Sequence, residues 1–199
     1  MIQTASPSKK KLLDAAIKHM LAKGYGATTV DEICKTAGLT KGSFFHYFET
    51  KEDLGKEALE YFYNIMRDLM VEEGFLTRPD PLDRIYGYID FVINFFQGDL
   101  SNRSCLLGNI AQELSNTHEE IRKLCAKLLK EQSAMFKQFL DEAKVKYAPK
   151  GNIDTQGLSD SLLSLIQGSL LYTKAIQDDK LLERNLTHYK ICLERLFGG

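Results

Sequence analysis

Residues 29–51 read TVDEICKTAGLTKGSFFHYFETK and have the pattern of two short helices joined by a tight turn. Thr29 can cap the first helix, because its hydroxyl can accept a hydrogen bond from a free backbone N–H two or three residues on. Gly38 follows at the point where the backbone must take the left-handed conformation that ends many helices. Thr40 can cap the second helix, expected from about residue 41 to 47. The stretch predicts a helix-turn-helix, a motif whose second helix usually enters the DNA major groove.

The second helix separates into an apolar face and a polar face. Phe44 and Phe48 are four residues apart, and we expect them to pack inward against Ile33 and Leu39. The outer face keeps side chains that can donate hydrogen bonds to phosphates or base edges: Lys41, Ser43, His46 and Tyr47. Gly42 has no side chain, so the backbone there can approach DNA closely. A helical hairpin whose polar residues are merely solvated would show the same spacing.

The run from Leu39 to Phe48 (LTKGSFFHYF), followed by KEDL at 51–54, resembles the signature of the TetR (tetracycline-repressor-like) family of transcriptional regulators. The similarity extends back through TTV at 28–30 and the turn KGY at 23–25. It covers about the first quarter of the chain closely, and the remainder agrees in length and helical character. The resemblance implies an all-helical, DNA-binding regulator.

Carried over position by position, the resemblance implies a role for each residue of the motif. The predicted DNA-binding set is Thr29, Thr40, Lys41, Gly42, Ser43, Phe45, His46, Tyr47 and Lys51. Base edges would be faced by Lys41, Gly42 and His46, and phosphates would be held by Ser43, Tyr47 and Lys51, with Thr29 doing so at the first helix. Phe45 stands where many members have a tyrosine whose hydroxyl meets a phosphate, so it offers only apolar contact.

Charge is unevenly distributed along the 199 residues. Residues 1–51 hold 8 Lys+Arg and 4 Asp+Glu, a net charge of +4, and the remaining 148 residues hold 18 and 23, a net charge of −5. A basic N-terminal part on an acidic remainder suits a small DNA-reading head on a body with another role. The +4 is modest, and a dimer would sum the phosphate contacts of two heads. We expect a DNA-binding domain at 1–50 and an effector-binding and dimerisation domain at 51–199.

The four cysteines are far apart and form neither a CxxC pair nor the Cys/His spacing of a zinc site. We therefore expect no metal and no cofactor. The N-terminus is polar and lysine-bearing, unlike a signal peptide, and no apolar run approaches the ~20 residues of a membrane span. These features predict a cytoplasmic protein with no membrane partner.

Hydrophobic periodicity predicts about nine helices and no strand, so the expected fold class is all-α. Ser6 or Ser8 can cap a first helix that backs the helix-turn-helix. A long helix from residue 51 to about 73 would link the head to the body. Further helices are expected at about 80–97 and 105–115, from a cap at Thr117 to about 147, from 154 or 155 to 177, and from Asp178 to 197.

The last two helices are apolar on more than one face, so they must be buried on more than one face. One large monomer core would satisfy them. A homodimer in which the segments at about 155–177 and 179–197 pair with their copies would also do so. The resemblance favours the dimer, because the family dimerises in this way to place two heads on a palindromic operator of double-stranded DNA.

The middle helices have a high density of aromatic residues, most of which we expect in the core. In the TetR family, the space between these helices and the penultimate one usually holds a small-molecule inducer, and an apolar pocket with a few polar groups suits such a ligand. The resemblance thus implies a small apolar or aromatic effector. The predicted effector-binding residues are Phe62, Met66, Tyr88, Phe91, Phe95, Cys105 and Tyr172.

Cys105 carries a second hypothesis. It lies at a predicted helix N-terminus, two residues from Arg103, and both features favour the reactive thiolate. The segment is also similar to the Gly-Cys-Leu stretch of a TetR subgroup that includes electrophile-sensing repressors, although Ser104 replaces the glycine. A buried, inert thiol packed beside the pocket is the alternative.

Catalysis has little support in the sequence, since the four histidines are scattered and no HExxH, nucleophile elbow or paired-carboxylate spacing occurs. The turn Gly24-Tyr25-Gly26 lacks a preceding strand and the third glycine of a nucleotide-binding loop. The expected protein is a dimeric repressor released from its operator by a small molecule. The alternatives are a thiol-based electrophile or redox sensor acting through Cys105 and a DNA-binding protein without effector.

Overall fold

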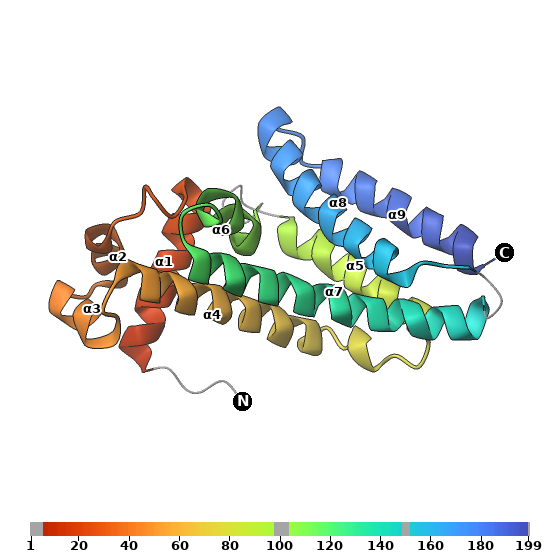
Figure 1. Cartoon of the computed structure of the whole chain (residues 1–199), viewed down its shortest axis with the longest axis horizontal. Helices are drawn as coiled ribbons and strands as arrows, with labels where there is room; N and C mark the ends of the chain where they lie inside the picture. Colours follow the sequence, from red (N-terminus) through yellow and green to blue (C-terminus); the bar gives the residue numbers. More distant parts are fainter. Residues whose placement is uncertain (1–5, 98–103, 149–151, 199) are drawn as a thin grey trace. The chain divides into compact units, whose positions relative to one another are not determined.

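The computed structural model describes residues 6–97, 104–148 and 152–198, which form nine α-helices, one 3₁₀ turn and no strand. Figure 1 labels the helices in chain order. They are α1 (Pro7–Lys23), α2 (Val30–Ala37), α3 (Lys41–Tyr47), α4 (Lys51–Glu72), η1 (Phe75–Thr77), α5 (Pro81–Phe96), α6 (Leu106–Leu114), α7 (Glu119–Tyr147), α8 (Thr155–Ile176) and α9 (Leu181–Phe197). The all-α prediction is confirmed.

Side chains at the predicted positions begin and end the first helices. The Ser6 hydroxyl accepts from the Lys9 N–H at 3.3 Å and so caps α1. Thr29 and Glu32 form a capping box at the start of α2, in which each side chain accepts from the other residue's backbone N–H. Gly38 ends α2 in the left-handed conformation, with φ at 66°. These three local signals place the helix-turn-helix where the sequence predicts it.

Two helix starts differ from the expected positions. Helix α9 begins at Leu181 rather than at Asp178, whose carboxylate instead accepts from the Lys180 N–H at 3.0 Å in the turn before the helix. Thr117 does not cap α7, because its hydroxyl donates back to the Leu114 carbonyl at 3.3 Å and helps to end α6. Asp and Thr are residue types that often cap helices. Here each forms its hydrogen bond within the turn before the helix instead.

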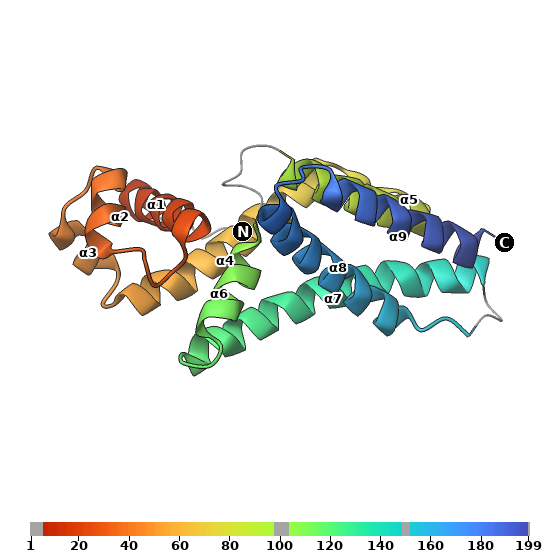
Figure 2. The same cartoon turned by 90° about the horizontal axis from the view of Figure 1, so that it is seen from above.

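Contacts divide the chain into two compact units. The first comprises the chain up to Arg67 together with Cys105–Leu128, and the second comprises Asp68–Ser104 and Leu129–Gly199. In the first unit α1, α2 and α3 pack together and α6 contacts α1. Figure 2 shows the three N-terminal helices clustered at the start of α4. The division describes packing, so the functional boundary at residue 50 remains a prediction.

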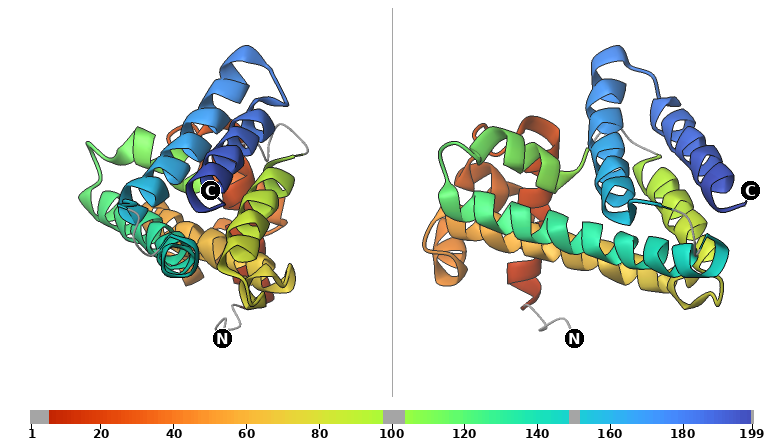
Figure 3. Two further views of the ribbon diagram at one scale, coloured as in Figure 1. Left: turned by 90° about the vertical axis from the view of Figure 1, so that its right-hand side faces the viewer. Right: turned by 45° about the vertical axis from the view of Figure 1, so that its right-hand side comes forward.

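In the second unit α5 contacts both η1 and α9. Helices α8 and α9 run side by side as a hairpin, seen most clearly in Figure 3. Asp80 caps α5 by accepting from the Leu82 N–H at 2.8 Å, and it also accepts from Lys146 and Tyr147 at the end of α7. These two donors, the lysine first, lower the pKa of Asp80 to about 2.

Two kinds of structure are absent from the described parts of the chain. None of the helices there is both long and apolar enough to cross a lipid bilayer. Over the same residues, no group of three or more His, Cys, Asp or Glu side chains is placed to hold a metal ion.

Candidate nucleic-acid interface and effector site

The helix-turn-helix is held by the aromatic side chains on the inner face of α3. Phe44 and Phe48 are fully buried, with ring centroids 5.5 Å apart, and Ile33 of α2 is buried with them. Phe45 lies on the opposite side and is 58% exposed. The expected inward packing of Phe44 and Phe48 is therefore confirmed, and α3 presents its other face to solvent.

The exposed face of α3 carries Lys41, Gly42, Phe45 and His46. The Lys41 ammonium lies 2.8 Å from the Asp31 carboxylate, and this hydrogen bond raises the pKa of Lys41. Both side chains are exposed, so the pair contributes little to stability and is screened by salt. Lys41 can therefore exchange Asp31 for a phosphate or a base edge at small cost.

Tyr47 and Lys51 make contacts within the head that leave donors available. The Tyr47 hydroxyl accepts from the Ser6 hydroxyl at 2.8 Å, which leaves its own proton for a phosphate oxygen. The Lys51 ammonium lies 4.2 Å from the centroid of the Tyr25 ring and donates to the Gly26 carbonyl over a long 3.4 Å. Burial lowers the pKa of Lys51, and two of its three N–H donors remain for DNA.

The predicted threonine contacts are engaged as helix caps. The Thr29 hydroxyl donates to the Glu32 carboxylate at 2.8 Å and accepts from the Glu32 N–H at 3.3 Å. The Thr40 hydroxyl accepts from the Ser43 N–H at 3.1 Å, and the two hydroxyls are 3.1 Å apart. The side chain of Lys23 and the contacts with Thr29 lower the pKa of Glu32 to about 2. A phosphate contact from Thr29 would have to replace its bond to Glu32.

The comparisons with known proteins agree with this geometry. The N-terminal part matches the family described as bacterial regulatory proteins, tetR family, over residues 12–58, and residues 81–189 match the tetracyclin repressor-like C-terminal domain. The chain belongs to the TetR family. It is therefore a DNA-binding transcriptional regulator, and the first match contains the whole helix-turn-helix.

Relatives match over most of the chain. The transcriptional regulator AcuR of Cereibacter sphaeroides is 28% identical over 173 residues, which is 85% of this chain and 78% of the relative. The repressor NemR of Escherichia coli is 26% identical over 187 residues, or 94% of each chain. Among solved structures, a TetR regulatory protein from Rhodobacter sphaeroides has a TM-score of 0.83 at 26% identity and covers 93% of this chain and 98% of its own. Reduced E. coli NemR has a TM-score of 0.77 at 27% identity, covering 92% and 95%.

The predicted effector residues are divided between the two compact units. Tyr88, Phe91 and Phe95 are on α5 in the second unit, where Phe91 and Phe95 have ring centroids 5.9 Å apart. The Tyr88 hydroxyl is satisfied by Gln132, which donates at 2.8 Å. Tyr172, on α8, is 54% exposed in the single chain. The remaining three predicted residues, Phe62, Met66 and Cys105, belong to the first unit.

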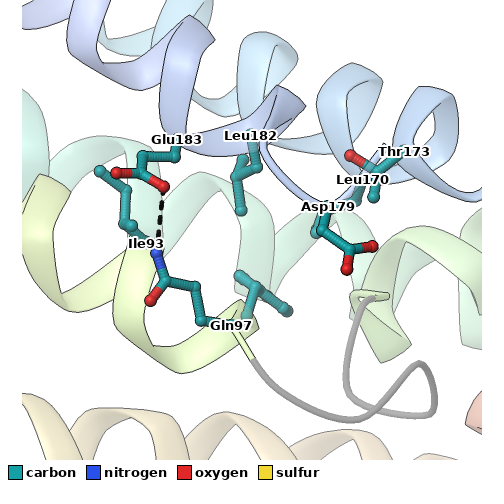
Figure 4. Close-up of a pocket in the computed structure, with 8 residues that line it drawn as sticks. Ile93, Gln97, Leu170, Thr173, Asp179, Leu182 and Glu183 are labelled. Carbon is teal, nitrogen blue, oxygen red and sulfur yellow. Dashed lines mark hydrogen bonds between the residues drawn. The ribbon is translucent and has the colours of Figure 1, made fainter. Parts of the chain in front are cut away.

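The second unit contains a hollow that the sequence did not indicate (Figure 4). It lies between α5, α8 and the start of α9, and its lining residues are Ile93, Phe96, Gln97, Leu170, Thr173, Asp179, Leu182 and Glu183. The Gln97 amide and the Glu183 carboxylate meet across its rim at 3.5 Å. The hydroxyl of Thr173 is buried without a hydrogen-bond partner among the described residues. The hollow offers about 10 Å³ for the centre of a water-sized sphere, which is room for about one water.

The Cys105 side chain is buried, whereas a sensing thiol would have to be reached by the electrophile. This residue directly precedes α6, as predicted, but its side chain is buried, with 8% exposed. Cys34 and Cys125 are also buried, and burial raises the pKa of the Cys125 thiol to about 11. Cys192 is exposed. Arg103 lies outside the described residues.

Proposed function

We propose that this protein is a dimeric repressor that binds a palindromic operator and is released by a small-molecule effector. The observation that carries the proposal is the face of α3, where Lys41, Gly42 and His46 are exposed on a helix anchored by buried Phe44 and Phe48. Such an anchored helix can enter the major groove without unfolding its core. A regulator with this role works where the DNA is, so we place it in the cytoplasm.

Selection from random DNA duplexes tests this function directly. Purified protein at a stated salt concentration should enrich a palindrome, because two α3 helices related by a two-fold axis read two equal half-sites. Enrichment of a single asymmetric half-site would contradict the dimer. If no sequence is enriched from any pool, and the affinity for DNA depends on the salt concentration but not on the sequence, sequence-specific DNA recognition would be contradicted.

The dimer is proposed to form through α8 and α9. In the single chain these helices expose large apolar side chains that a soluble surface rarely gathers on two neighbouring helices: Leu171, Tyr172 and Ile176 on α8, and Ile191 and Leu196 on α9. The pairing would bury them, and it explains why Tyr172 is exposed here. In this proposal Tyr172 lies in the dimer interface. A contact between Tyr172 and the effector would therefore be made at that interface.

We propose that the effector binds in the body and is small and apolar or aromatic. Tyr88, Phe91 and Phe95 on α5 are its proposed aromatic contacts, and Phe62 and Met66 remain proposed contacts. The hollow beside Thr173 is a further candidate position, since a ligand there would meet an unsatisfied hydroxyl. It would have to widen the space, and because α8 and α9 form two of its walls, widening would act on the proposed dimer helices.

A thiol-sensing function is the second candidate. It is favoured by the position of Cys105 before α6 and by the similarity, over 94% of the chain, to NemR, for which a solved structure is of the reduced form. Sensing predicts that an electrophile modifies Cys105 and that modification releases operator DNA. Because Cys192 is the exposed thiol, it should react first, and a Cys192→Ser variant isolates Cys105. If alkylated Cys192→Ser protein stays on the operator, or if Cys105 in it remains unmodified, thiol sensing through Cys105 is excluded.

A further inference from the structure

The turn Gly24-Tyr25-Gly26 between α1 and α2 is held by a carboxylate that lies 88 residues away in sequence. The Tyr25 N–H donates to Glu113 Oε2 at 2.8 Å, and the Gly26 N–H donates to Glu113 Oε1 at 2.5 Å. Glu113 is at the end of α6, in the same compact unit as the turn. Two successive backbone N–H groups directed at one anion are a strong, charge-assisted arrangement.

The glycines of this turn leave the space that the carboxylate occupies. A Cβ added at Gly26 would lie 2.7 Å from Glu113 Oε1, and one added at Gly24 would lie 2.9 Å from Oε2. Gly24 also has a φ of 86°, which an L side chain rarely adopts. Gly26 does not have a positive φ, so at Gly26 the approach of Glu113 is the main constraint on the side chain.

The turn that Glu113 holds positions two proposed DNA contacts, Lys51 and Thr29. Its Gly26 carbonyl accepts from the Lys51 ammonium, and its Tyr25 ring lies 4.2 Å below that ammonium. The Tyr25 carbonyl accepts from the Thr28 N–H at 3.1 Å, directly before the Thr29 cap of α2. Movement of the turn would therefore shift both Lys51 and the start of α2.

We propose that Glu113 is a positioning residue for operator binding, although it lies outside the helix-turn-helix and carries the wrong charge for DNA. It acts through the turn: its carboxylate fixes the backbone of Tyr25 and Gly26, and these residues place the Lys51 ammonium. This inference rests on the proposed operator-binding function. The proposal predicts that loss of the Glu113 carboxylate weakens DNA binding. A simple charge effect predicts the opposite, because removing a negative charge near phosphates should by itself strengthen DNA binding.

The first test uses Glu113→Gln with Glu119→Gln as the matched control. Glu119 is exposed in the same unit, pairs only with neighbours on its own helix in the described contacts, and does not touch the turn. The glutamine amide introduced by Glu113→Gln could offer one acceptor but would direct an NH₂ group at the second backbone N–H. We expect Glu113→Gln to weaken binding to the selected operator about tenfold, and Glu119→Gln to leave it within about twofold. Equal or tighter binding by Glu113→Gln would overturn the proposal.

A double-mutant cycle tests the contact from the other side. Gly26→Ala should displace the carboxylate without removing its charge, and it should cost about the same tenfold in operator binding. In a Glu113→Ala background the same Gly26→Ala change should cost little, because the added Cβ no longer meets the carboxylate. Additive losses in the two variants would contradict a shared role.

Amide hydrogen exchange separates this proposal from the function on which it rests. The Tyr25 and Gly26 amides should exchange slowly in the wild-type protein and at least tenfold faster in Glu113→Gln, with global unfolding unchanged. If the wild-type protein selects no operator, the proposed function fails while the exchange result still judges the contact. If operator binding is intact and the two amides exchange alike in both proteins, the positioning role itself is wrong.

Discussion

Replacing Gly87 by alanine should destabilise the body by overpacking it. Gly87 lies on α5 against the 3₁₀ turn, and an added Cβ would be 2.9 Å from Phe75 Cγ and closer still to Phe75 Cβ. Non-bonded carbons prefer about 3.5–4.0 Å. Phe75 is buried, and rotation of its ring cannot move its own Cβ, so the backbone of η1 or α5 must shift.

The magnitude follows from two opposing effects. Overpacking of this kind costs about 1–3 kcal/mol, and a clash with an atom next to the backbone belongs at the upper end. The exchange of glycine for alanine inside a helix returns about 1 kcal/mol. The expected net loss is about 2 kcal/mol in the free energy of unfolding. For a chain of this size that corresponds to a midpoint temperature lower by about 4–8 °C.

Thermal unfolding followed by circular dichroism measures the effect, at one fixed protein concentration because a dimer's midpoint depends on it. Gly42→Ala is the control: it makes the same exchange in a helix, but its added Cβ would lie an ordinary 3.6 Å from the Thr40 hydroxyl. That variant should unfold at or slightly above the wild-type temperature. A Gly87→Ala protein as stable as the wild type would refute the reasoning about the α5–η1 contact.

Three further predictions concern DNA, pH and assembly. His46→Ala should change the sequence preference in the duplex selection, whereas Lys51→Ala should weaken all DNA alike and reduce the salt slope by about 1; the opposite pattern would reverse the assigned roles. Because a lysine and a tyrosine hold the pKa of Asp80 at about 2, below its usual 3.8, the stability that this carboxylate contributes is present above about pH 4 and lost as the pH falls through 2. The difference in denaturation midpoint between wild type and Asp80→Asn should therefore shrink between pH 5 and pH 2, and a constant difference would exclude the ion pair as its cause. Tyr172→Glu on α8 should yield monomers in sedimentation, while Val145→Glu on α7, at a site 75% exposed, should leave dimers; dimers in both variants would place the interface elsewhere.

The helix-turn-helix could be predicted from the sequence because its determinants are local. Thr29 and Glu32 are three residues apart and bond to each other's backbone, and Gly38 adopts a conformation that its own lack of a Cβ permits. Phe44 and Phe48 fall on one face of α3 at the spacing of a helical turn. Interactions within a few residues depend little on the rest of the fold, so the sequence alone determined this part.

Side-chain environments in the body were decided by tertiary packing. Periodicity showed that α8 is apolar around much of its girth, but only the packed chain shows that Tyr172 faces outward while Thr173 is buried beside a hollow. The signal at Cys105 was a helix N-terminus, which is present, yet burial withdraws its thiol from solvent. Periodicity identifies a face, and the neighbouring elements determine what covers it.

The contact between Glu113 and the turn at Tyr25 and Gly26 shows most directly what could not be predicted from the sequence. The sequence marks the two glycines as a turn, and it gives Glu113 as one carboxylate among many. Nothing local relates residues 88 positions apart, because their meeting depends on how α6 packs against α1. The sequence by itself determined the family and the DNA-reading motif, whereas the tertiary structure decided which distant group holds that motif in place, since chain folding alone brings an acceptor to two backbone donors.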